Sequence, residues 1–115
     1  MDEEKISHLA EDFQKCQKIL VAIGDENRLH LMTEMMKMNK CMGVRVGEIT
    51  ERTHLSRPAV SHHLQILKDA GILKVRSEGT KNYYYFDSEL DSMKKLIRTL
   101  QNAVDIASAL PDRNL

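Results

Sequence analysis

The chain has little of what marks fibrous, disulfide-rich or disordered proteins. Its 115 residues include two cysteines, two prolines, five glycines and no tryptophan, and the formal net charge is zero. With 42% hydrophobic and 30% charged residues, this composition is typical of a globular domain, so we expect disorder only at the two ends. A chain of this length forms one domain with a modest core, and a second copy of the chain would add stability.

Long hydrophobic runs are also missing. No stretch approaches the roughly 18 uninterrupted apolar residues of a transmembrane helix, and the acidic start Met1–Glu4 lacks the pattern of a signal peptide. We therefore expect a cytoplasmic protein with no membrane partner. Cys16 and Cys41 are too few for a disulfide framework and lack the CxxC spacing of a zinc or redox motif, so they are interpreted as reduced thiols.

Motifs of catalysis and metal binding are absent from the sequence. It contains no glycine-rich phosphate loop, no HExxH helix and no serine in a nucleophile-elbow context, so we predict that the protein is not an enzyme and has no cofactor. His8, His30 and His54 show no paired ligand spacing. Met32, Met35 and Met36 have helical core spacing, which favours packing over a soft-metal role, and we expect no metal site.

The zero net charge hides an uneven distribution. Six basic and two acidic residues lie between Arg52 and Lys81, a balance of +4, whereas the rest of the chain carries −4. A basic centre between acidic ends is compatible with a nucleic-acid partner, since phosphate neutralisation supplies most non-specific affinity.

Residues 46–86 contain the most informative pattern. A short helix spans about Gly47 to Thr53, a turn follows at His54–Ser56, a second helix runs to Gly71, and two short strands flank Glu78–Gly79. Ser56 can cap the second of these helices, Pro58 falls in its first turn, and Gly71 suits its end. Helix, turn, helix and hairpin predict a winged helix-turn-helix, whose geometry suits a DNA major groove.

The two ends of the chain carry apolar stripes with heptad spacing. In residues 3–23 and in the last helix the separations are 3, 4, 3, 4 and 3. Each stripe could pack on the domain's own core, but two such helices exceed what a small core needs, so we favour a homodimer. The predicted interface residues are Ile6, Leu9, Phe13, Leu20, Leu90, Met93, Ile97, Leu100 and Val104.

These features predict a mostly α fold with a small β-hairpin. Residues 1–115 would form one domain, with dimerisation helices in 1–23 and 88–110 and the helix-turn-helix plus wing in 46–86. Between them, a helix capped by Asp25 would run to about Met38.

The helix that begins after Ser56 has two faces. Val60, Leu64 and Leu67 form the inward stripe, and His63 points toward it as a packing residue. The opposite face is polar and suits base edges and phosphates, while basic hairpin residues suit phosphates or the minor groove. The candidate DNA-binding residues are Ser56, Arg57, Pro58, Ser61, His62, Gln65, Lys68, Lys74, Arg76 and Lys81.

Two stretches, Gly24–Leu29 and above all Leu55–Leu73, closely resemble the ArsR/SmtB family. The likeness extends from about residue 15 to residue 100. It implies a dimeric winged-helix repressor whose first and last helices form the dimer interface and whose DNA is released by an inducer. By matching position, the resemblance places Arg57, Pro58, Ser61 and His62 where the family contacts DNA.

The chain departs from the family at two metal sites. Many metal sensors of the family carry a Leu-Cys-Val-Cys-Asp-Leu-like stretch, which here reads Val44–Ile49, with Arg45 and Gly47 in the cysteine places. The family's site on the last helix needs histidines, and none follows His63. The resemblance thus implies a regulator without the usual metals, whose inducer is unknown.

The leading prediction is a sequence-specific DNA-binding regulator, acting as a homodimeric repressor on an imperfect inverted repeat near its own promoter. One alternative is a redox-responsive or unusual-metal sensor that uses Cys16 and Cys41. Another is a winged helix whose polar face binds a protein instead of DNA.

Overall fold

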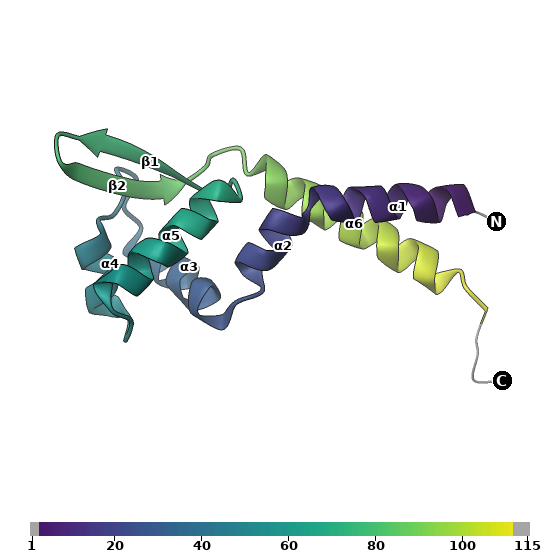
Figure 1. Cartoon of the computed structure of the whole chain (residues 1–115), viewed down its shortest axis with the longest axis horizontal. Coiled ribbons are helices and arrows are strands. Elements are labelled where there is room, and N and C mark those ends of the chain that lie inside the picture. Colours follow the sequence, from purple (N-terminus) through teal and green to yellow (C-terminus); the bar gives the residue numbers. More distant parts are fainter. Residues whose placement is uncertain (1–2, 112–115) are drawn as a thin grey trace.

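The computed structural model describes residues 3–111, which form six α-helices and one antiparallel hairpin (Figure 1). Residues 1–2 and 112–115 of the predicted 1–115 domain lie outside the described residues. The elements are, in chain order, α1 (Glu3–Lys15), α2 (Gln17–Ile23), α3 (Glu26–Met38), α4 (Val46–Arg52), α5 (Arg57–Asp69), β1 (Leu73–Glu78), β2 (Lys81–Phe86) and α6 (Asp91–Ser108). The predicted mostly α fold with a winged helix-turn-helix is confirmed.

The described residues are elongated, with principal extents of 58 × 27 × 22 Å. Helices α2 to α5 and the hairpin form a head, and α1 and α6 pack side by side and project from it (Figure 1). The core of the head consists of buried apolar residues from α2, α3, α4, α5, the strands and the start of α6. Leu31, Ile49, Leu64 and Leu67 are its largest fully buried side chains in the helices of the head.

The predicted continuous helix over residues 3–23 is interrupted at Cys16, which separates α1 from α2. The Cys16 amide donates to the carbonyls of both Asp12 and Phe13, at 3.1 Å each, and the thiol is buried 3.8 Å from the Thr99 hydroxyl of α6. The bend lets α2 enter the core while α1 follows α6. Ile19 and Ala22 therefore face the core of the head, whereas Leu20 and Ile23 are only half-buried.

Two further details differ from the sequence-based expectations. Met32 and Met35 are buried as predicted, but Met36 is 61% exposed because it lies beyond the inward face of α3. The last helix begins at Asp91, and Leu90 precedes it in a left-handed conformation with φ of 51°.

The ends of α3 and α5 follow the local signals in the sequence. The Asp25 carboxylate accepts the Arg28 amide and caps α3, and the Ser56 hydroxyl accepts the Ala59 amide and caps α5. At the end of α5, Gly71 has φ of 82° and donates to Lys68 while Ile72 donates to Leu67. This is the Schellman arrangement, and it turns the chain directly from α5 into the hairpin.

The hairpin pairs Leu73 with Phe86 at its base and Glu78 with Lys81 at its tip. Gly79 occupies the first of the two turn positions with φ of 61°, which suits the tight turns that match strand twist. An isolated bridge between Val44 and Tyr84 fixes the loop before α4 against β2.

Candidate nucleic-acid interface

The exposed face of α5 carries the side chains predicted for base contacts. Val60, Leu64 and Leu67 are fully buried on the opposite side, so the helix orientation is fixed by the core. Exposed residues of this segment are Ser56, Arg57, Pro58, Ser61, His62, Gln65 and Lys68. The structure therefore brings together the α5 part of the predicted set on one solvent-facing surface.

Two of these side chains have defined intramolecular neighbours. The Gln65 amide donates to the Asp69 carboxylate at 2.9 Å, one helical turn away. The Arg57 guanidinium lies against Gly47 of α4, where an added Cβ would come within 3.2 Å of its Nη1 atom. Gly47, which has no Cβ, thus leaves room for Arg57.

The three predicted wing residues differ in their surroundings. Lys74 lies 3.8 Å from the Asp87 carboxylate, and Lys81 is exposed at the start of β2. Arg76 is held more firmly, because it pairs with Glu78, donates to the Met42 carbonyl at 3.0 Å and stacks 4.6 Å over the Tyr83 ring. Arg76 therefore also stabilises the junction between the wing and the loop that precedes α4.

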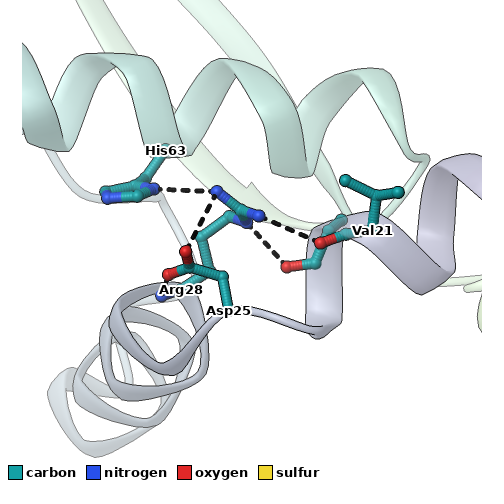
Figure 2. Close-up of polar contacts among 5 residues, drawn as sticks. Val21, Asp25, Arg28 and His63 are labelled. Carbon is teal, nitrogen blue, oxygen red and sulfur yellow. Dashed lines mark hydrogen bonds and ion pairs between the residues drawn. The ribbon is translucent and has the colours of Figure 1, made fainter.

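Arg28 was not predicted from the sequence as a functional residue, although it lies in the Gly24–Leu29 stretch. Its side chain is almost fully buried between α2, α3 and α5 (Figure 2). Nε donates to the Ala22 carbonyl at 2.7 Å and Nη2 to the Val21 carbonyl at 2.9 Å. A lone arginine in an amphipathic helix gives no signal of such burial, which requires acceptors from another element.

The same guanidinium reaches α5. Its Nη1 atom lies 3.1 Å from Nδ1 of His63 and 3.9 Å from the Asp25 carboxylate (Figure 2). Burial lowers the pKa of His63, Arg28 and His62 lower it further, and Asp25 opposes them. The predicted role of His63 as a hydrogen-bonded packing residue is confirmed.

A second carboxylate joins α3 to α4. Glu34 is largely buried, with Lys37 at 2.9 Å and Arg52 at 3.7 Å. The hydrogen bond from Lys37 lowers the pKa of Glu34, so the carboxylate stays charged near neutral pH. This contact fixes the first helix of the helix-turn-helix against α3.

The two cysteines have different environments. Cys16 is buried beside α6, whereas Cys41 is exposed in the loop after α3, and both thiols are free. Within residues 3–111, no group of three or more histidine, cysteine, aspartate or glutamate side chains could hold a metal ion. Nor is any helix in this range long and apolar enough to cross a bilayer.

The predicted dimer residues divide into two groups. Leu9, Phe13, Leu20, Leu90 and Met93 are half-buried within the chain. In contrast, Ile6, Ile97, Leu100 and Val104 are 45%, 62%, 44% and 57% exposed. Helix α6 packs on its own chain through Leu96 and Thr99, and the part of its heptad stripe that contains Ile97, Leu100 and Val104 lies on a neighbouring, exposed face.

Known proteins resemble the chain in both sequence and fold. The family described as "Bacterial regulatory protein, arsR family" matches residues 25–75. An uncharacterized HTH-type transcriptional regulator of Methanocaldococcus jannaschii is 38% identical over 91 residues, covering 78% of this chain and 99% of the relative. The arsenical resistance operon repressor of Bacillus subtilis is 32% identical over 89 residues, covering 77% of this chain and 78% of the relative.

A solved structure supports the same assignment. The homodimeric winged helix-turn-helix DNA-binding domain of a possible ArsR-family regulator from Mycobacterium bovis superposes with a TM-score of 0.56. It is 25% identical and the match covers 91% of this chain and 88% of that domain.

Proposed function

Because the chain belongs to the arsR family of bacterial regulatory proteins, it is a DNA-binding transcriptional regulator and not an enzyme, and we propose that it acts as a homodimeric repressor on an inverted-repeat operator. The observation that carries this proposal is the polar face of α5, whose side chains Arg57, Ser61, His62, Gln65 and Lys68 are all exposed, with the basic hairpin following α5 directly in the chain.

Each side chain of this face has a contact that its chemistry favours. Arg57 would pair bidentately with guanine. Gln65 would release its hydrogen bond to Asp69 and pair with adenine instead. Ser61 and His62 would contact base edges or phosphate oxygens. Ser56 and Pro58 lie at the positive end of the α5 dipole, where backbone amides favour phosphate. Lys68, Lys74, Arg76 and Lys81 would supply phosphate contacts that set affinity more than sequence choice.

The exposed stripe of Ile97, Leu100 and Val104 supports the homodimer. A contiguous apolar stripe on a helix that already packs on its own chain is costly in water, and a second copy covers it by an isologous contact. The similar domain from Mycobacterium bovis is homodimeric. Two copies would present two α5 helices about 34 Å apart, which matches successive major grooves on one face of the duplex.

The repressor role rests on the relative from Bacillus subtilis, a repressor of an arsenical resistance operon. The inducer of this chain would differ from the family's usual metals, since Arg45 and Gly47 stand in the cysteine places. The regulator would act in the cytoplasm, where its operator lies.

Selection of bound sequences from random duplex DNA with the purified protein tests the proposal. We expect an enriched imperfect inverted repeat with half-sites one helical turn apart, and an affinity that falls steeply with salt. Absence of any enriched sequence, or binding that ignores salt, would contradict it.

The same selected operator tests the redox and metal alternative. Fluorescence anisotropy is followed while zinc, cadmium, copper(I) or an oxidant is added to the wild type and to the Cys16→Ser and Cys41→Ser variants. A response that the cysteine variants abolish would favour the sensor, and a flat titration would exclude these effectors.

A further inference from the structure

Arg28 occupies the point where three helices of the head meet. The carbonyls of Val21 and Ala22 lie in the last turn of α2, where the helix leaves its carbonyls without intrahelical partners. A guanidinium satisfies two of them and complements the negative end of the helix dipole. Arg28 therefore closes the carboxyl end of α2 from the first turn of α3.

The remaining contact determines the protonation state of His63. Arginine only donates hydrogen bonds, so Nδ1 of His63 must accept, and the ring proton must lie on Nε2. An imidazolium has no acceptor nitrogen. Protonation of His63 would break this hydrogen bond and place two cations side by side.

The surroundings of His63 favour the neutral ring. The charged and titratable groups that face it are Arg28 and Asp25 from the start of α3 and His62 from α5 itself, while α2 contributes the Val21 and Ala22 carbonyls to the same cluster. Asp25 is already engaged, since it caps α3 through the Arg28 amide and lies 3.9 Å from the Arg28 guanidinium. The lowered pKa of His63 agrees with this geometry.

We propose that Arg28 is a positioning residue for DNA recognition, which ties the recognition helix α5 to α2 and α3 through a neutral His63. This inference rests on the proposed function. His63 precedes Leu64 of the core and follows His62 of the DNA-facing surface, so a change in its contact moves both sides of α5. DNA binding is then sensitive to acid through a residue that does not touch DNA.

His62 is a second histidine, exposed on the DNA-facing side of α5, and its contribution to binding must be the same in the proteins compared. The comparison must therefore be made between the wild type and a His63→Gln variant, which keeps His62 and offers an acceptor to Arg28 without titrating. The ratio of the two affinities isolates His63.

The experiment measures anisotropy of the selected operator at about pH 7.5 and about pH 5.5, at one ionic strength, for the wild type, His63→Gln, Arg28→Gln and Arg98→Gln. Arg98→Gln removes the same charge from an exposed site on α6. We expect acid to weaken the wild type severalfold relative to His63→Gln, and by less than about tenfold because the pKa of His63 lies below its ordinary value. Arg28→Gln should bind about tenfold more weakly at the higher pH, and Arg98→Gln should follow the wild type.

An NMR titration of the His63 ring gives a readout that general destabilisation would not produce. In Arg28→Gln we expect the pKa of His63 to rise, because a neighbouring cation has been removed and Asp25 remains. If Arg28→Gln fails to fold, the pH profile of His63→Gln against the wild type decides.

Two outcomes would overturn the inference while leaving the proposed function intact. One is a pH dependence that is the same in the wild type and in His63→Gln, and the other is a folded Arg28→Gln protein with wild-type affinity at both pH values. A wild-type protein that binds no duplex at either pH would instead refute the proposed function and this inference with it.

Discussion

Val44 and Tyr84 exchange two backbone hydrogen bonds of 2.8 Å each, which attach the loop before α4 to the second strand of the wing. The wing is thereby linked to the helix-turn-helix from both sides, through this bridge and through the Schellman turn after α5. Arg76 adds a third link by donating to the Met42 carbonyl. The position of the basic hairpin relative to α5 is therefore set by backbone contacts.

Gly43 is the residue that this bridge depends on most. Its φ is 98°, and an added Cβ would lie 3.0 Å from the Tyr84 carbonyl oxygen and 3.1 Å from the Tyr83 Cβ atom. We expect Gly43→Ala to lower the free energy of unfolding by about 2–3 kcal/mol, as measured by urea denaturation. Gly79→Ala is the control: its φ is also positive but nothing lies within 4 Å, so about 1 kcal/mol is expected. Equal losses at the two sites would show that the contacts with Tyr83 and Tyr84 do not contribute to the loss of stability in Gly43→Ala.

Arg57 tests the recognition surface. We expect Arg57→Ala to weaken binding to the selected operator by about 1–3 kcal/mol and to relax the preference at one base pair, because a bidentate contact is lost. Anisotropy with the operator and with substituted duplexes measures both effects. Lys94→Ala removes an exposed charge from α6 and serves as the control. Unchanged affinity in Arg57→Ala would refute the assignment of this face.

The wing residues Lys81 and Arg76 separate affinity from stability. Lys81→Ala should weaken binding to all duplexes equally and reduce the magnitude of the salt slope by about 1, with no change in thermal stability. Arg76→Ala should reduce both the affinity for DNA and the thermal stability, since Arg76 also contacts Met42, Glu78 and Tyr83. Salt titrations and thermal melts of the two variants check this, and equal melting temperatures would contradict it.

The uncovered stripe on α6 predicts the oligomeric state. Ile97→Glu should convert a dimer into a monomer at micromolar concentration, because it places a carboxylate in the centre of the apolar contact. Arg98→Glu puts the same side chain on the polar side of α6 and should remain dimeric. Sedimentation velocity measures both variants, and a wild type that sediments as a monomer would rule out the dimer.

Glu48 predicts a pH dependence of stability. Its carboxylate pairs with Lys40 and accepts the Arg45 amide at 3.0 Å, and the Lys40 hydrogen bond followed by the Arg45 amide lowers its pKa below the usual value of 4.5. The native state thus binds this proton less readily than the unfolded state. The stabilisation is complete above the usual pKa and is lost as the pH falls through the lowered one.

We expect Glu48→Gln to cost about 0.5–1 kcal/mol at neutral pH, a modest value because the side chain is partly solvated. The difference from the wild type should shrink below about pH 4, where the wild-type carboxyl is protonated as well. Urea denaturation at the two pH values measures this. A constant difference would show that the charge of Glu48 is unimportant.

Much of the fold was predictable because its signals are local. Asp25, Ser56 and Gly71 each act on groups within five residues along the chain, and the structure has them where the sequence placed them. The two faces of α5 follow from a 3.6-residue period. The break at Cys16 was not predictable in this way, since the heptad spacing runs through it without a proline or glycine.

The sequence by itself determined the order of helices and strands, the ends of α3 and α5, and the polar face of α5, because backbone propensity, capping and periodicity depend on near neighbours. Only the tertiary structure decided which face of α6 stays uncovered and how Arg28 meets His63, 35 residues away. A buried arginine is stable only where packing supplies its acceptors, and those come from separate helices whose arrangement no local pattern encodes.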